Sequence, residues 1–328
     1  MWLLVPPVPA GYVSVVRDAR HGDAGDTSQG TWGDRKSCVP RAATVRAMAT
    51  ATAARDGTPL SRADVLARMR VNGDFDLDDH RPDETFGWKK AQAKSDCDAE
   101  IAAVAELQKR LFAGSSQALL VVLQAMDAGG KDGLIRDVMT GINPAGIRVT
   151  GFGVPCETDL AHDYLWRVHP ACPARGHIGV FNRSHYEDVL VVRVKKLAPE
   201  ERWRPRYEHI RAFERHLVAE GTTIVKLFLN ISAEEQRARM QDRIDSPDER
   251  WKFRRGDLED RALWPEYMKA FRDALAETST PDAPWYVVPG DRKWVRNLAA
   301  AHILHDALER LDPRYPEPED GIEGLVIT

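Results

Sequence analysis

Residues 118–133 of this 328-residue chain read ALLVVLQAMDAGGKDG. The first seven residues form an unbroken apolar run of strand length that ends in Gln124, which is typical of a central strand covered on both faces. The glycines that follow predict a tight turn, and the pattern then predicts a helix over 133–142. A buried strand, a glycine-containing turn and a helix, in that order, are the setting of a phosphate-binding loop.

The turn carries side chains that suit phosphate chemistry. Gly130 and Lys131 match the Gly-Lys pair of the pattern GxxxxGK[ST], whereas Ala125 stands in place of the first Gly and Asp132 in place of Ser or Thr. We expect the loop amides and the helix N-terminus to bind phosphate oxygens, and Lys131 to reach the transferring group. The expected phosphate ligands are Ala128, Gly129, Gly130, Lys131, Asp132 and Gly133. The alternative is a plain strand–helix turn whose acids are solvated.

A second polar segment, FNRSHYED over residues 181–188, follows a strand predicted over 177–181. Ligands in open α/β sheets bind at the carboxyl ends of the strands, so we expect Asn182 and Arg183 to lie near Lys131. Arg183 is suited to neutralising phosphoryl charge. We expect Asp188 to bind a metal ion, and we expect Glu187 and Asn182 to bind the nucleotide. The alternative for both acids is the first turn of a helix over 184–194, where negative charge favours the helix dipole.

A basic segment spans residues 237–255, which hold seven basic and four acidic side chains. Arg239 and Arg243 are four residues apart and therefore share one face of a predicted helix. A mobile basic helix pair after the fourth strand is similar to the lid of small kinases, which excludes water when it closes. We place this lid at about 237–264. The alternative is a solvated helix of mixed charge.

The whole chain alternates predicted strands and helices, which indicates an α/β fold with a doubly wound parallel sheet. The predicted strands are 118–124, 147–152, 177–181, 222–230 and 285–289, and the predicted helices include 61–69, 89–112, 133–142, 157–168, 184–194, 208–219, 264–275 and 293–311. We divide the chain into a flexible extension over 1–60, a phosphotransferase domain over 61–312 and a Pro-rich acidic tail over 313–328. Met48 is a second candidate start, which leads to the hypothesis that residues 1–47 precede the translated chain.

Composition narrows the classes of partner. The formal net charge is −4, which argues against a general nucleic-acid binder. No apolar run approaches the length of about 18 residues that a membrane span needs. The four cysteines, Cys38, Cys97, Cys156 and Cys172, are widely spaced and are expected to be reduced thiols of a cytoplasmic protein. Any polyanion site must therefore come from local placement of basic side chains.

These segments resemble the polyphosphate kinase 2 family. Residues 124–133 resemble its Walker A segment and residues 181–188 its Walker B segment, and 143–144, 161–166 and 251–253 fit the same family. The resemblance covers about residues 70–312. It implies a three-layer P-loop kinase core with a helical lid. It also implies phosphoryl transfer between inorganic polyphosphate and nucleotides with Mg²⁺, in homo-oligomers built from dimers.

The resemblance also implies roles for single residues. Asp127 would hold Mg²⁺ and help to position the acceptor phosphate, while Lys131 and Arg183 would bind the phosphates undergoing transfer. Lid arginines, with Arg239 and Arg243 as candidates, would grip the polyphosphate chain. Some family members have Asp where this chain has Asn182, so we assign no metal role to that position. The version found here is similar to the subgroup that accepts AMP as well as ADP.

The sequence thus favours a reversible polyphosphate-dependent phosphorylation of AMP, ADP or both. An ATP-dependent kinase of nucleotides or another small acceptor would share the loop and the lid, and differs only in its donor. A third reading is a sensor that binds phosphate chains or nucleotides without turnover. Retention of both the Gly-Lys pair and Arg183 argues against the sensor.

Overall fold

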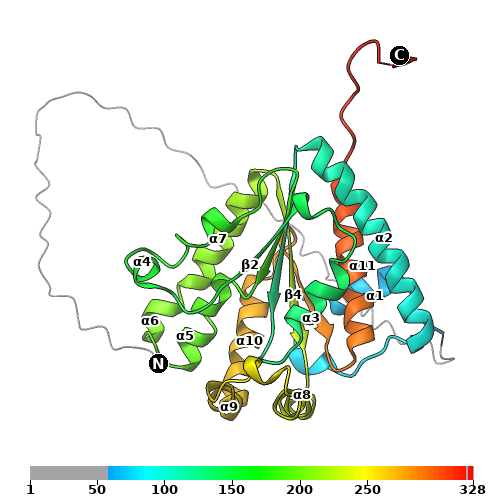
Figure 1. The fold of residues 1–328 in the computed structure, drawn as a ribbon. Helices are drawn as coiled ribbons and strands as arrows, with labels where there is room; N and C mark the ends of the chain where they lie inside the picture. The colour runs from blue at the N-terminus through cyan, green and yellow to red at the C-terminus, as the bar shows by residue number, and fades with distance from the viewer. Residues whose placement is uncertain (1–57, 323, 328) are drawn as a thin grey trace, which may run out of the picture. The chain divides into compact units, whose positions relative to one another are not determined.

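Five parallel strands form the centre of the fold in the computed structural model, which describes residues 58–322 and 324–327 (Figure 1). The strands lie in the order β2-β3-β1-β4-β5. They are β1 (Ala118–Gln124), β2 (Ile147–Gly151), β3 (Ile178–Asn182), β4 (Thr222–Asn230) and β5 (Trp285–Pro289). The predicted doubly wound parallel sheet is confirmed, and β1 pairs with β3 on one side and β4 on the other. The carboxyl end of β1 is therefore the point where the strand order reverses, which is where such sheets bind ligands.

Helices cover both faces of the sheet, and two helices lie at its carboxyl end (Figure 1). One face packs against α1 (Arg62–Met69), α2 (Lys90–Gly114), α3 (Lys131–Val138) and α11 (Lys293–Leu311). The other face packs mainly against α5 (Val191–Val194), α6 (Glu200–Trp203), α7 (Arg206–Ala219) and α10 (Trp264–Thr278). The remaining α-helices are α4 (Glu157–Leu160), α8 (Ala233–Asp245) and α9 (Gly256–Ala262). Short 3₁₀ turns span Leu77–Asp79, Pro144–Gly146, His169–Ala171, His185–Asp188 and Arg250–Lys252.

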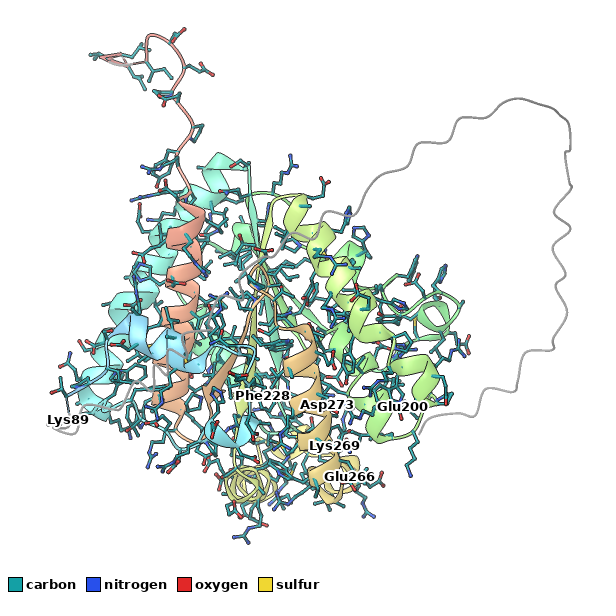
Figure 2. The ribbon with its side chains drawn as sticks, turned by 180° about the vertical axis from the view of Figure 1, so that it is seen from behind. Lys89, Glu200, Phe228, Glu266, Lys269 and Asp273 are labelled. Atoms are coloured by element: carbon teal, nitrogen blue, oxygen red, sulfur yellow. The ribbon has the colours of Figure 1, made fainter. Side chains whose placement is uncertain are left out.

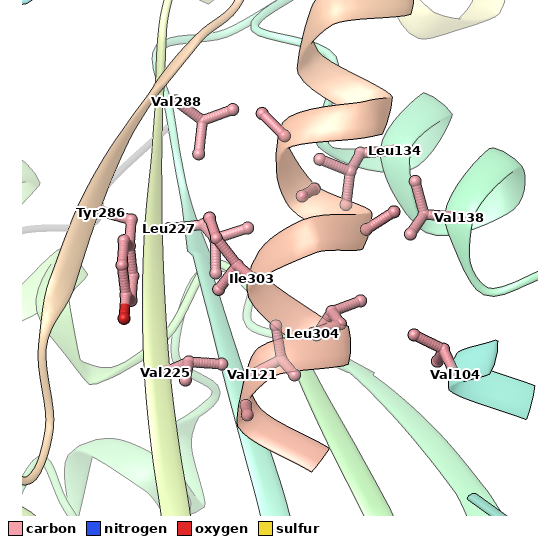
Figure 3. Packing of buried hydrophobic residues seen from close by; sticks show 14 of the residues in the cluster. Val104, Val121, Leu134, Val138, Val225, Leu227, Tyr286, Val288, Ile303 and Leu304 are labelled. Atoms are coloured by element: carbon pink, nitrogen blue, oxygen red, sulfur yellow. The ribbon is translucent and has the colours of Figure 1, made fainter. Parts of the chain in front are cut away.

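The apolar run of β1 is buried because its side chains alternate between two cores. Leu119, Val121 and Leu123 belong to the core beneath α11, and Leu120 and Val122 belong to the core beneath α7 and α10. In the first core, Val121 lies beside Leu304 and Ile303 of α11, as Figure 3 shows. All seven residues of β1 are buried.

The second core is closed by aromatic side chains. Phe228 of β4 meets Phe271 of α10 with ring centroids 4.5 Å apart. Figure 2 shows Phe228 near α10, which carries Glu266, Lys269 and Asp273. The two cores fix the sheet from both sides, so the loops at its carboxyl end rest on a rigid base.

Two predicted helices are wrong. The segment over 157–168 is helical only in α4, because the side chain of Asp163 accepts a hydrogen bond from the amide of Leu165 and starts a turn there. The segment over 184–194 divides into a 3₁₀ turn and α5. There the hydroxyl of Ser184 accepts from the amide of Tyr186, whose ring is fully buried. In addition, α3 begins at Lys131 and ends at Val138, earlier than predicted at both ends.

The outer parts of the chain remain largely predictions. The extension expected over 1–60 lies outside the described residues except for its last three, and so does Cys38. Ser61 caps α1 by accepting from the amide of Asp64. The three cysteines in the described part are free thiols. None of the helices described is both long enough and apolar enough to cross a bilayer.

Candidate active site

The loop after β1 and the turn after β3 lie side by side because their strands are neighbours in register. Leu123 pairs with Asn182, and the amide of Arg183 donates to the carbonyl of Leu123 at 3.1 Å. Ala128 and Arg183 both adopt the left-handed conformation, with φ of 61° and 62°, which non-glycine residues rarely do. Backbone strain of this kind is common at binding sites, where surrounding structure maintains it.

The loop ends at the N-terminus of α3. Gly130 has φ of 95° and stands directly before the helix. Within the residues that the structure describes, the amides of 130–133 donate to no backbone carbonyl, whereas the amide of Gly129 closes the turn onto Met126. Unused amides at a helix N-terminus form an anion site together with the positive end of the helix dipole. The segment predicted to bind phosphate therefore presents such amides at the N-terminus of α3.

Lys131 lies inside this loop. Its side chain is 8% exposed, and Nζ donates to the carbonyl of Ala125 at 3.0 Å and, more weakly, to that of Met126 at 3.5 Å. Burial, followed by the nearby charge of Arg183, lowers the pKa of Lys131 to about 8. A phosphate arriving at the amides would restore the positive form, because opposite charge favours it.

Arg183 joins the two halves of the site. It forms an ion pair with Asp127 of the loop, and its other nitrogen lies 3.8 Å from the carboxylate of Glu187. Burial raises the pKa of Glu187, although Arg183 and Lys131 oppose the rise. Asp127, Lys131, Arg183 and Glu187 thus form one compact group of alternating charge.

Asn182 also reaches across the site. Its Nδ2 donates to Oδ1 of Asp132 at 2.6 Å, which ties the end of β3 to the first turn of α3. In the structure Asn182 therefore contacts a carboxylate of the loop. The contact with the nucleotide that we predicted for Asn182 stays a prediction.

Asp188 has different partners from those that we predicted. Nη1 of Arg206 donates to its Oδ1 at 3.0 Å, and the same guanidinium lies over the ring of Tyr164, 4.7 Å from the centroid. Burial raises the pKa of Asp188 to about 6. The structure thus groups Glu187, and not Asp188, with Asp127 and Lys131. We therefore transfer the metal hypothesis from Asp188 to Glu187.

Arg239 lies beneath the loop, which is a correction to its expected position on a mobile lid. It is 9% exposed, and its guanidinium donates to the carbonyls of Ala128 at 3.2 Å and Gly290 at 2.6 Å. Arg243, one turn later, is partly exposed and remains a candidate for binding polyphosphate. Side chains on the inner face of α8 therefore support the loop from below. Only the segment after α8 is placed to act as a lid.

Sequence reasoning missed two further loop supports. Gln236 is fully buried and donates from Nε2 to the carbonyl of Asp127 at 2.9 Å. Arg296 of α11 is 1% exposed and donates to the carbonyl of Gly130 at 3.1 Å. Burial and the nearby charge of Arg239 lower the pKa of Arg296 to about 10. For Arg296 the available signal was a charged residue among the apolar residues Val295, Leu298 and Ala299 of one helix. Gln236 lies in a mostly polar helix, so the local pattern carried no signal for it.

A parallel sheet of order 2-3-1-4-5, a phosphate-binding loop at its switch point and helices over its carboxyl end define a P-loop phosphotransferase. The family model of polyphosphate kinase 2 matches residues 87–316, and the chain belongs to that family.

Two curated relatives and one solved structure agree with this membership. The "AMP/ADP-polyphosphate phosphotransferase" of Meiothermus ruber is 53% identical over 262 residues, which cover 79% of this chain and 98% of the relative. The "ADP-polyphosphate phosphotransferase" of Rhodopseudomonas palustris is 46% identical over 230 residues, covering 66% and 80%. The crystal structure of polyphosphate kinase 2 from Arthrobacter aurescens TC1 has a TM-score of 0.76 at 42% identity, over 79% of this chain and 93% of that one.

Proposed function

We propose that this protein transfers phosphoryl groups reversibly between inorganic polyphosphate and AMP, ADP or both. The observation that carries the proposal is the grouping of Asp127, Lys131 and Arg183 around the unused amides of the loop. The names of the two relatives support the choice of polyphosphate and adenine nucleotides as substrates.

The transfer needs positioning and charge neutralisation more than covalent catalysis. The loop amides and Lys131 bind the phosphate that is transferred, and Arg183 neutralises the charge that develops on its oxygens. The nucleotide phosphate attacks in line from the side of Asn182 and Glu187. The segment after α8 closes over both substrates and keeps water from taking the phosphoryl group.

The site suits Mg²⁺. Asp127 and Glu187 offer carboxylate oxygens, the ligands that Mg²⁺ prefers, beside the phosphate amides. In the part of the chain that is described, no three His, Cys, Asp or Glu side chains converge as a metal cage. Phosphate oxygens and water would therefore complete the shell, as is usual for this ion. When bound, Mg²⁺ supplies positive charge shared by the phosphate oxygens.

Polyphosphate needs a longer basic surface than the loop provides. Such a surface is offered by Arg243 near the end of α8 and by Arg254 and Arg255 of the lid segment after it, both of which are exposed. Because the chain has a net charge of −4, these local residues must attract the polyanion. We further expect a cytoplasmic homo-oligomer built from dimers, which size measurements in solution would test.

The deciding experiment is a donor–acceptor matrix, in which polyphosphate or ATP is offered to AMP, ADP, GMP and GDP with and without Mg²⁺. Lys131→Ala and Asp127→Ala should each remove most of the turnover with polyphosphate. Lys94→Ala, an exposed change on α2, is the control and should keep full activity. Near-normal turnover in either site variant would refute the assignment. Turnover with ATP alone would identify the alternative kinase, and tight binding without turnover would identify a sensor.

A further inference from the structure

One buried amide connects the loop to the lid. Gln236 of α8 donates from Nε2 to the carbonyl of Asp127 at 2.9 Å, and its Oε1 accepts from Nη1 of Arg261 at 2.8 Å. Gln236 is fully buried, so neither end can exchange its partner for water without a movement of the helix. Arg261 belongs to α9, and the same nitrogen donates to the carbonyl of Ala233 at 2.7 Å.

A second set of contacts holds α9 through Asp260, the residue next to Arg261. Asp260 lies 2.8 Å from Nζ of Lys195 and accepts from the hydroxyl of Tyr267 at 2.9 Å. This attachment leads to the body of the protein and does not involve the loop. Of the attachments described for α9, the one through Arg261 and Gln236 reaches the carbonyl of Asp127, the residue to which the proposed function assigns Mg²⁺.

We propose that Gln236 is a positioning residue that couples the closed position of α9 to the position of Asp127. This inference rests on the proposed function. An amide suits the task because it carries a donor at one end and an acceptor at the other. While Arg261 occupies Oε1, the amide is fixed in rotation and Nε2 points at the loop. When the lid opens, Arg261 leaves, the amide is released and Asp127 loses a fixed support.

Three substitutions distinguish the contributions of the two hydrogen bonds made by the amide of Gln236. Gln236→Met keeps the volume and removes both hydrogen bonds. Gln236→Glu keeps an acceptor for Arg261 and sets a carboxylate against the carbonyl of Asp127. Arg261→Met removes the hydrogen bond at the lid end, together with that to the carbonyl of Ala233, and leaves the bond between Gln236 and the loop. Gln241→Met is the matched control, because Gln241 is exposed on the same helix and its side chain donates to Asp245, away from the loop and from α9.

Steady-state kinetics with polyphosphate and AMP or ADP test the coupling. We expect each of the three variants to lower kcat by about 10- to 100-fold, because small misplacements at a reacting centre cost this much. The KM for polyphosphate should stay within about threefold, since the exposed lid arginines are intact. The double variant Gln236→Met/Arg261→Met should be no slower than Gln236→Met alone. Independent residues would instead multiply their losses within about a factor of two, which would overturn the coupling.

A second measurement does not depend on turnover. Hydrogen–deuterium exchange in the loop peptide around residues 125–131 should rise in Arg261→Met, although the hydrogen bonds described for Arg261 go to Ala233 and Gln236 of α8. Unchanged exchange in that peptide would overturn the proposal. Absence of polyphosphate turnover in both the wild type and Gln241→Met would instead count against the proposed function, while the exchange experiment would still judge the coupling.

Discussion

Nη1 of Arg296 donates to the carbonyl of Gly130, and a Cβ atom added to Gly130 would lie 2.2 Å from that nitrogen. The guanidinium comes from α11, at the far end of the sequence, and occupies the space that a side chain on the loop would need. Gly130 also has φ of 95°, which L side chains rarely adopt. The positive φ therefore favours glycine strongly, and the buried guanidinium adds a second constraint, because it would have to shift to admit a Cβ atom. Only the first of these can be read from a sequence motif.

Gly130→Ala should abolish most activity. The added methyl group must displace Arg296, which would shift the carbonyl and the amides beside it. We expect kcat/KM to fall by on the order of 100-fold or more. The control is Gly141→Ala, because Gly141 also has a positive φ of 83° but no atom within 4 Å of the added Cβ. That control should lose about 1–2 kcal/mol of stability and keep its activity. Equal activity losses in both variants would attribute the effect to backbone strain alone.

The pKa of Lys131 predicts a pH dependence. Burial and the charge of Arg183 lower this pKa to about 8, so the free enzyme loses the charged form above that pH. Because phosphate binding needs the charge, kcat/KM for polyphosphate should fall about tenfold per pH unit above pH 8. The fall in kcat should begin at higher pH, since bound polyanion raises the pKa. A kcat/KM that stays flat to pH 9.5 would contradict this.

The lowered pKa of Lys131 changes stability with pH in the opposite direction from activity. An unfolded Lys keeps its proton up to its ordinary pKa of 10.5, whereas folded Lys131 releases it near 8. Between these values the unfolded state binds more protons, so the contribution of Lys131 to stability rises with pH. Urea unfolding of the wild type and Lys131→Met should show a difference that moves in favour of the wild type from pH 8 to 10.5. A difference that is constant over this range would place the pKa elsewhere.

A buried ion pair supports the turn that holds Arg183. Nζ of Lys226 lies 2.5 Å from Glu214, and both side chains are almost completely buried, beside the hydroxyl of Tyr186. Lys226→Met leaves the buried carboxylate of Glu214 without its ammonium partner, although the hydroxyl of Tyr186 and the ring of His185, at 3.5 Å, stay beside it. The loss should be about 3–5 kcal/mol. Lys226→Met/Glu214→Gln should recover about half of that loss, because the remaining group is neutral.

Denaturant unfolding measures the stability of both variants, and an exposed ion pair serves as the control. Arg204→Met breaks the ion pair with Glu200 on the surface and should cost less than about 1 kcal/mol. If Lys226→Met cost no more than this control, the pair would not be a significant part of the stability.

The sequence predicts strands and loop chemistry well because these depend on neighbouring residues. The strand predicted over 222–230 agrees with β4 at both ends, because the places where its apolar run starts and stops are visible in the sequence itself. Arg239 and Arg296 are different. Their charges favour a surface position, and only the loop carbonyls, which come from elsewhere in the chain, explain their burial. Tertiary hydrogen bonds of this kind leave little trace in a local pattern.

The most specific prediction for the site distinguishes two adjacent acids. Glu187 lies 3.8 Å from Arg183, within the charged group around Lys131, whereas Asp188 is paired with Arg206 at 3.0 Å. If Glu187 helps to hold Mg²⁺, Glu187→Gln should raise the Mg²⁺ concentration that gives half-maximal activity by about 10-fold or more. Asp188→Asn should leave that concentration unchanged, because its carboxylate serves Arg206.

Asp188→Asn should instead reduce stability, because it removes the negative partner of a largely buried guanidinium. The expected loss is on the order of 2–3 kcal/mol in urea unfolding. A Mg²⁺ titration of both variants, followed by unfolding of both, therefore gives opposite patterns for the two residues. If Asp188→Asn alone shifted the Mg²⁺ dependence, the metal role would return to Asp188, and the ion pair with Arg206 would have to open when substrate binds. The two acids differ by one position in the chain, so the comparison holds the surrounding loop constant and changes only the carboxylate.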